Sequence, residues 1–106
     1  MPGTRRRRRS DANQAAIVQT LRLAGCGVEI ISDVGRGVPD LIVANRVIGT
    51  RLVEVKKPGE RLTPTEAKWH EAWPVPVSVV TGPVDAFHWL YVEETKCQTQ
   101  QTTRST

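Results

Sequence analysis

The sequence has few of the features that mark exported, disulfide-bonded or membrane-spanning proteins. Its 106 residues include two Cys, three Trp, one Tyr and one Phe. Cys26 and Cys97 are too few for a disulfide framework or a structural zinc site, so we expect reduced thiols in a cytoplasmic protein. No apolar run approaches the roughly 20 residues that cross a bilayer, and the N-terminus lacks the apolar centre of a signal peptide. We therefore expect a soluble, unexported protein that folds as one domain.

The positive charge of the chain is concentrated near its N-terminus. Five of the 15 basic residues form one run, and the other ten stand against 11 acidic residues, so the run accounts for the net charge of +4. Such a run attracts polyanions, and its self-repulsion favours disorder, so we expect residues 1–10 to form a disordered arm. The run indicates nucleic-acid contact, a merely solvated tail or an expression artefact. Its members are Arg5, Arg6, Arg7, Arg8 and Arg9.

Alternating and helical spacings predict one helix and three strands in the first half of the chain. Apolar residues at helical spacing follow capping residues, which predicts a helix over 11–24 that glycines end. A flexible loop is expected over 33–39, closed by a proline. The strands are predicted at 28–31, 40–44 and 51–56.

The second half begins with the signals of a helix start. Thr63, Pro64 and Glu66 combine an N-cap, a proline at the first helical position and a capping-box glutamate, so we expect a helix over 64–73. A fourth strand is predicted at 75–80 and a last helix at 84–92.

The remaining residues, 93–106, are rich in Thr, Gln and Ser without an apolar period, and we expect a disordered tail there. The resulting order, αβββαβα, describes an α/β sandwich over residues 11–92.

Three ionisable residues stand where the predicted strands would bring them together. Asp40 begins one strand, and Glu54 and Lys56 lie two residues apart on the next. Because side chains alternate along a strand, Glu54 and Lys56 share a face, whereas Val53 and Val55 point into the core. If the two strands are neighbours, Asp40 joins the other two.

These residue types suit phosphodiester hydrolysis. Two carboxylates that lie close together repel, and a divalent cation such as Mg²⁺ keeps both ionised; the carbonyl of Val55 would be a further ligand. Lys56 would orient a metal-bound water or offset negative charge on a phosphoryl group. The structural alternative is an exposed ion pair on a strand beside an Asp in a turn.

The same residues carry a resemblance to a known superfamily. The segments GVPDLI at 37–42 and LVEVKKP at 52–58 resemble the signature of the PD-(D/E)xK nucleases. Over about residues 11–91 the chain is most similar to small stand-alone VRR-NUC-type nucleases of phages and bacteria, and then to Holliday junction resolvases.

The resemblance implies a fold and an activity. The fold would be restriction-endonuclease-like, with a mixed four-stranded sheet flanked by helices. The activity would be Mg²⁺- or Mn²⁺-dependent endonuclease action on DNA, often branched or flapped, in the cytoplasm of a bacterial or phage-infected cell. Asp40 and Glu54 would bind the metal, and Lys56 would be the catalytic lysine. We expect a homodimer, as in resolvase-like relatives, because a monomer of this size has little surface to grip both arms of a branched substrate.

The chain departs from the pattern of the superfamily at two places. The first helix commonly supplies an acidic residue, and here Asp11, Asn13 and Gln14 are the candidates near its start. Glu66 stands where related nucleases tend to have a glutamine. It is interpreted mainly as the capping-box residue, with a role facing metal or water as the alternative.

Four other residues are candidates for contact with phosphate. Arg36, between two glycines before Asp40, would reach a phosphate near the metal or else be simply solvated. Lys57 and Arg61 would extend a phosphate-binding rim, and Ser32 is a weaker candidate for the same rim.

Aromatic and histidine side chains favour structural interpretations. Trp69, Trp73 and Trp89 are interpreted as core filling, with base stacking as the alternative. His70 and His88 have no acidic or Cys partner at ligand spacing, and we expect them to be solvated or at the edge of the core.

The main alternative function is that of a catalytically inactive DNA-binding or structural relative with an incomplete first-helix ligand. Two others remain open: the same fold acting on nicked or linear duplex DNA, and an RNA-binding domain. The last is disfavoured because the predicted strands lack interleaved aromatic residues.

Overall fold

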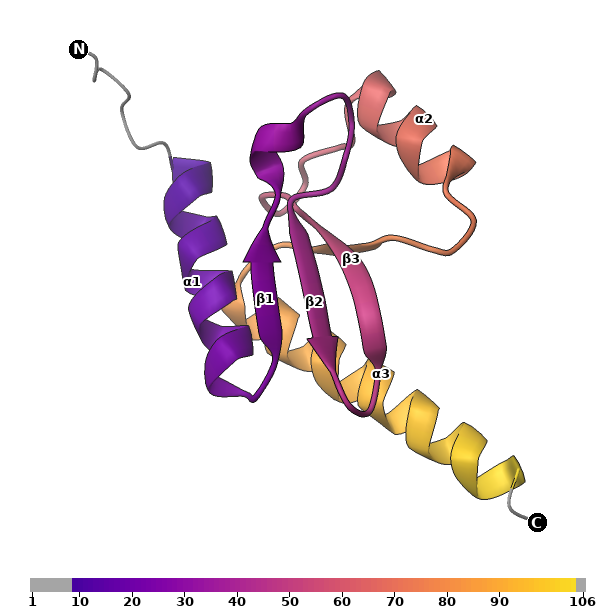
Figure 1. The fold of residues 1–106 in the computed structure, drawn as a ribbon. Coiled ribbons are helices and arrows are strands. Elements are labelled where there is room, and N and C mark those ends of the chain that lie inside the picture. The colour runs from indigo at the N-terminus through magenta and orange to yellow at the C-terminus, as the bar shows by residue number, and fades with distance from the viewer. Residues whose placement is uncertain (1–8, 105–106) are drawn as a thin grey trace.

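The computed structural model describes residues 9–104, which form a four-stranded sheet and three helices (Figure 1). Of the predicted basic arm, residues 1–8 lie outside this range, and residues 9 and 10 belong to the first helix. The elements are α1 (Arg9–Leu23), β1 (Gly27–Ile30), a short 3₁₀ helix (Ser32–Val34), β2 (Leu41–Asn45), β3 (Gly49–Val55), α2 (Pro64–Ala72), β4 (Ser78–Val80) and α3 (Pro83–Arg104).

The sheet is mixed, in the order β1-β2-β3-β4. The first three strands pair antiparallel, whereas β4 pairs parallel with β3. A parallel neighbour requires a crossover connection, and the segment that contains α2 provides it. The predicted αβββαβα order and the restriction-endonuclease-like fold are confirmed.

The hydrophobic core lies between the sheet and two of the helices. α1 and α3 contact each other, α1 contacts β1, and α3 contacts β4. The alternate residues of the strands point into this layer, as the period of a strand requires. The core contains Ile17, Val18 and Leu21 of α1, Val28, Leu41, Val43, Val53 and Val80 of the strands, and Ala86 and Leu90 of α3.

Helix α2 stands apart from this core, beyond the end of β3 in Figure 1. None of its residues is buried. Trp69 stacks on Trp73 with ring centroids 4.6 Å apart, and Trp73 remains 42% exposed. The prediction that both fill the core was therefore wrong, because α2 does not lie over the core. Trp89 of α3 does pack against it.

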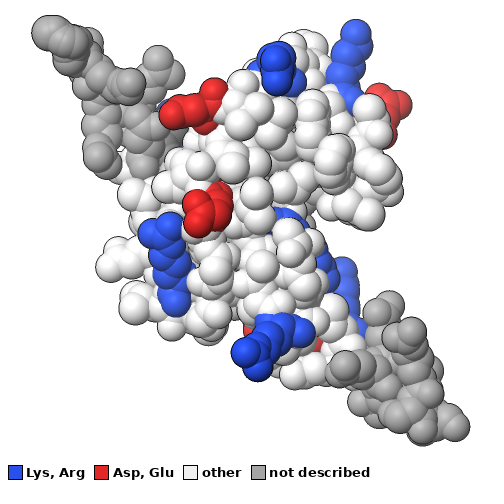
Figure 2. All heavy atoms as spheres, in the orientation of Figure 1, with Lys and Arg blue, Asp and Glu red and all other residues white. Residues whose placement is uncertain are grey.

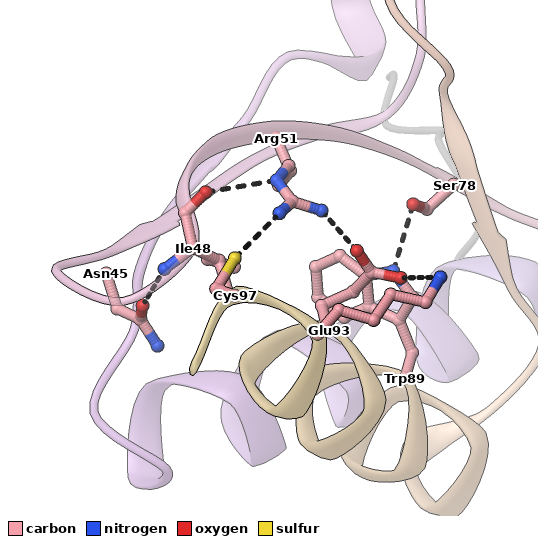
Figure 3. A network of polar contacts seen from close by, with 8 residues as sticks. Asn45, Ile48, Arg51, Ser78, Trp89, Glu93 and Cys97 are labelled. Atoms are coloured by element: carbon pink, nitrogen blue, oxygen red, sulfur yellow. Dashed lines mark hydrogen bonds and ion pairs between the residues drawn. The ribbon is translucent and has the colours of Figure 1, made fainter. Parts of the chain in front are cut away.

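Residues 93–106 were predicted to be disordered, and for residues 93–104 the structure corrects this, since α3 continues to Arg104, whereas residues 105 and 106 lie outside the described range. The helix is anchored by polar contacts that an apolar period cannot reveal (Figure 3). Arg51 of β3 pairs with Glu93 at 2.5 Å and contacts the sulfur of Cys97 at 3.6 Å. Asn45 donates to Glu94 at 2.9 Å.

The fourth strand is shorter than predicted. It covers Ser78–Val80 and not the whole of 75–80. Pro74 and Pro76 have no N–H group to donate to a neighbouring strand, so regular pairing begins only after them.

Within residues 9–104, the helices are each too short or too polar to cross a membrane.

The contacts of α3 with β2 and β3 should stabilise the whole domain. A chain ended after Val92 lacks Glu93, Glu94 and Cys97, and we expect its free energy of unfolding to fall by about 2–3 kcal/mol, since partly exposed ion pairs and hydrogen bonds contribute about 1 kcal/mol each. Urea denaturation followed by circular dichroism measures this. A chain ended after Thr99 keeps all three residues and is the control. Equal midpoints for the two truncations would contradict the anchoring role.

Candidate active site

The antiparallel pairing of β2 with β3 brings two carboxyl groups together. Leu41 is the register partner of Val53, so Asp40 and Glu54 face each other one step further along. Asp40 Oδ2 also accepts a hydrogen bond of 2.8 Å from the backbone N–H of Val55. The predicted meeting of Asp40 with the Glu54 strand is thus present in the structure, on the side of β3 away from the core residue Val53.

Glu54 is almost completely buried, with 2% of its surface exposed. Burial raises the pKa of its carboxyl to about 9, and the neighbouring Asp40 carboxyl, which repels its charge and shares a hydrogen bond with it, contributes to the same rise. A buried carboxyl beside another carboxyl is costly to ionise unless a cation lies close by. A positive charge close to these two carboxyl groups would therefore be favourable.

Lys56 is also buried, with 6% exposed, and acidic side chains surround its ammonium group. Its Nζ lies 2.6 Å from Glu66 and 3.8 Å from Glu60. Burial acts to lower the pKa of Lys56, but the hydrogen bond and charge of Glu66, with smaller contributions from Glu54 and Glu60, outweigh it, and the pKa is raised. Lys56 is therefore a cation at neutral pH.

Glu66 has the capping role that the sequence favoured, and its role facing metal or water stays a prediction. The capping box is present: Thr63 accepts from the N–H of Glu66, and Glu66 Oε1 accepts from the N–H of Thr63 at 2.9 Å. Burial acts to raise the pKa of Glu66, but Lys56 and the hydrogen bonds with Thr63 outweigh it, so the pKa is lowered. Glu66 also lines the cavity described below.

His70 is a site residue that the sequence interpretation missed. Its Nε2 lies 3.3 Å from Glu54 Oε1, whereas no acidic partner was expected. Burial lowers the pKa of His70, which favours the neutral ring. The available signal was its position four residues after Glu66, which places both side chains on one face of α2.

A cavity of about 330 Å³ opens beside these residues. Asn13 and Gln14 of α1 line it, as does Ser32, so the structure brings the predicted first-helix candidates to the site. Asn13 donates to the carbonyl of Thr81 at 3.1 Å, and Gln14 donates to the Ser32 hydroxyl at 3.3 Å. The side chain of Asp11 lies outside the described part of the molecule. The described side chains that α1 contributes to the cavity are therefore polar and uncharged.

The loop before Asp40 is held against α2 by a close backbone approach. A Cβ on Gly37 would lie 2.6 Å from the carbonyl oxygen of Thr65, and Gly37 has a φ of 85°. Only glycine fits both requirements. This contact places the start of α2 beside Pro39, which is fully buried, and so beside Asp40.

The predicted phosphate contacts divide into two groups. Lys57 lines the cavity, but Arg36 and Arg61 do not, and all three are exposed. Arg36 has a φ of 57°, a left-handed conformation that non-glycine residues adopt rarely. Two of the four candidates, Ser32 and Lys57, thus line the cavity.

Comparison with known families identifies the family of this domain. The family model of the VRR-NUC domain matches residues 9–73, more than half of the chain. The chain belongs to the VRR-NUC family. The match includes α1, β2, β3 and α2, so it covers every side chain of the site described above, whereas Thr81, which contributes a backbone carbonyl, lies outside it. Neither a search of curated proteins nor a search of solved structures found a match.

Family membership confirms the suspected resemblance and makes this a nuclease domain. Among the described residues no group of three or more His, Cys, Asp and Glu is arranged to hold a metal ion. Among the described residues, four acidic side chains line the cavity: Asp40 and Glu54 lie together at its centre, and Glu60 and Glu66 lie beside Lys56. Amide side chains of α1 occupy the remaining side of the cavity.

The raised pKa of Glu54 predicts how stability depends on pH in a chelator-treated sample. The folded pKa of about 9 lies above the ordinary value of 4.5, so the contribution of neutral Glu54 is complete below about pH 4.5 and is lost as pH rises toward 9. Glu54→Gln carries no charge and escapes this loss. We expect it to gain roughly 1 kcal/mol of stability over the wild type for each pH unit between 5 and 8.

Urea midpoints at pH 5, 6.5 and 8 measure this difference. Glu29→Gln, at an exposed position on β1, is the matched control for removal of one acidic group. A difference between Glu54→Gln and the wild type that stays constant over this range would contradict the raised pKa.

Proposed function

We propose that this VRR-NUC domain is a metal-dependent DNA endonuclease that hydrolyses phosphodiester bonds. The observation that carries the proposal is the pair of neighbouring carboxyl groups, the half-buried Asp40 and the buried Glu54, with the charged Lys56 directly after β3. The described protein residues do not fully compensate burial and charge repulsion at this pair, as the raised pKa of Glu54 records. Such pairs serve to hold a divalent cation.

The side chains of the site fit Mg²⁺ or Mn²⁺. Asp40 and Glu54 supply hard oxygen ligands, and the carbonyl of Val55 and an amide oxygen of Asn13 or Gln14 are the further candidates. The bound ion would activate a water molecule and stabilise charge on the phosphoryl oxygens. Two carboxylates with uncharged ligands suit Mg²⁺, which usually keeps several waters in its coordination shell.

Lys56 acts as a positive charge in this proposal. Because its pKa is raised, it is a poor proton acceptor at neutral pH, so its part is to donate hydrogen bonds. One of its three N–H groups points to Glu66, which leaves others for the attacking water or the phosphoryl oxygen. The negative charge that develops on the phosphoryl group is thereby offset without moving the lysine proton.

Substitution of the central residues should abolish cleavage without unfolding the domain. We expect Lys56→Ala and Asp40→Ala to lower kcat by about 100-fold or more, since each removes charge that the transition state requires. Labelled four-way, flap and linear DNA are incubated with Mg²⁺, Mn²⁺ or chelator. Lys68→Ala, on an exposed part of α2, is the control for removal of a lysine.

Two outcomes of this experiment would contradict the proposal. Metal-dependent cutting that persists in both variants would remove the assigned site. No cutting of any substrate by the wild type would favour the second candidate, a catalytically inactive DNA-binding or structural relative. The observation in favour of that candidate is the uncharged first-helix wall formed by Asn13 and Gln14.

DNA contact beyond the site is proposed to involve the five-arginine run, together with Lys57. Figure 2 shows the basic side chains of the described surface at separate places on this face and not in one continuous patch. A run of arginines at the N-terminal end of α1 would add phosphate contacts close together, because the basic side chains on this face of the domain lie apart from one another. Selection of branched, flap or Holliday junction DNA and the homodimer remain predictions from the sequence.

Removing the run should change affinity but not the chemical step. Deleting residues 1–8 leaves α1 intact from Arg9 and removes four arginines. We expect weaker DNA binding and a plot of log affinity against log salt that is flatter by roughly 0.9 for each phosphate that these arginines neutralise. Fluorescence anisotropy at several salt concentrations measures it, with deletion of residues 1–4 as the control. A failure to cut at saturating DNA would show a different role for the run.

A further inference from the structure

Helix α2 meets strand β3 through two parallel polar contacts. Glu66 and His70 lie four residues apart on α2, and Glu54 near the end of β3 lies two residues before Lys56, which directly follows the strand. Glu66 Oε1 is 2.6 Å from Lys56 Nζ, and His70 Nε2 is 3.3 Å from Glu54 Oε1. Because the order along the helix is opposite to that along the strand, the two elements run antiparallel at this contact.

The spacing of the two pairs explains why both contacts form at once. Four residues of an α-helix advance by about 6 Å, and two residues of a strand advance by about 6.6 Å. When Glu66 reaches Lys56, His70 therefore lies level with Glu54. The capping box at Thr63 and the close approach at Gly37 set the position of the first pair, and His70 follows from it.

The contact matters because Glu54 is the most deeply buried acidic residue of the site. A buried carboxylate that binds a metal ion through one oxygen needs a hydrogen-bond donor for the other. Among the described residues of α2, His70 is the one that reaches Glu54, and it does so at Oε1. The ring nitrogen Nε2 carries its hydrogen toward Glu54 when the carboxylate is ionised, which leaves Oε2 for a metal ion.

We propose that His70 is a positioning residue that orients the carboxylate of Glu54 for metal binding. This role rests on the proposed metal-dependent function, and it is distinct from that function because His70 itself contacts neither the metal nor the DNA. His70 also fills the space beside Glu54, where its side chain is 13% exposed. The orientation is thus supplied by a helix that has no buried residue of its own.

Three variants separate a positioning role from a structural one. His70→Leu removes the donor and keeps an apolar side chain of similar size. His70→Gln keeps an N–H donor, because its amide nitrogen reaches about as far from the backbone as Nε2. His88→Leu, at an exposed position on α3, is the matched control. Circular dichroism and the fluorescence of the stacked Trp69–Trp73 pair verify that α2 stays in place.

The measurement is Mn²⁺ affinity of the full chain, by titration calorimetry and by the electron paramagnetic resonance signal of free Mn²⁺. We expect His70→Leu to weaken Mn²⁺ binding by about 10-fold or more, as is typical for partners of metal ligands, and His70→Gln to stay within about 3-fold of the wild type. The Mg²⁺ concentration that gives half-maximal cleavage should rise in the same order, with kcat at saturating metal less affected.

The outcomes distinguish the inference from the function on which it rests. Wild-type binding of Mn²⁺ with equal affinity in His70→Leu would overturn the positioning role alone. Equal weakening in His70→Leu and His70→Gln would also overturn it, because the donor would then be irrelevant. A wild type that binds no Mn²⁺ at millimolar concentration would overturn the proposed function itself, and the positioning role with it.

Discussion

The site depends on one constraint: two carboxyl groups lie opposite each other at the end of a β-ladder, one of them buried and the other half-buried. Strand pairing places Asp40 and Glu54 together whether or not their charges are compensated. The free energy for this comes from the apolar layer beneath them, where Leu41 and Val53 are completely buried. A stable sheet therefore holds an unfavourable electrostatic arrangement in place, and in the proposed function a divalent cation relieves it.

The three helices are joined to this part of the sheet in two different ways. Helix α2 contributes no buried residue, and its contacts with the sheet are those of Glu66 and His70 with the charged end of β3. Its position is set mainly by polar contacts and by the close approach of Gly37 to Thr65. Helices α1 and α3, in contrast, pack through the core and give the sheet its rigidity. The sheet, α1 and α3 thus share the hydrophobic core, whereas α2 is joined to the sheet through residues of the site.

Much of the fold and of the central site could be predicted because it depends on local patterns. The alternation of side chains along β3 places Glu54 and Val53 on opposite faces of the strand. The capping box at Thr63 marks the start of α2. His70 could not be found in the same way, since its partner lies on another element and the matching of helix and strand spacings appears only in three dimensions. The roles of these residues in catalysis remain predictions.

The errors in the second half of the chain have a related cause. Composition predicted disorder after residue 92 because the segment lacks an apolar period, but Arg51 and Asn45 on the sheet provide polar partners for Glu93 and Glu94. Such long-range pairs leave no trace in the local sequence. Trp69 and Trp73 were assigned to the core on hydrophobicity alone, which cannot distinguish a helix over the core from one beside it.

A single oxygen atom connects the start of α2 to the lysine of the site. Oε1 of Glu66 accepts from the backbone of Thr63 and also contacts Lys56. The atom that caps the backbone of the helix is therefore the atom that holds the ammonium group. Unwinding of the first turn of α2 would move Glu66 and so break its contact with Lys56. Fraying of the helix and a change in the orientation of the lysine would therefore occur together. A glutamine at this position could retain the cap but would weaken this tether, because its amide oxygen carries no net charge.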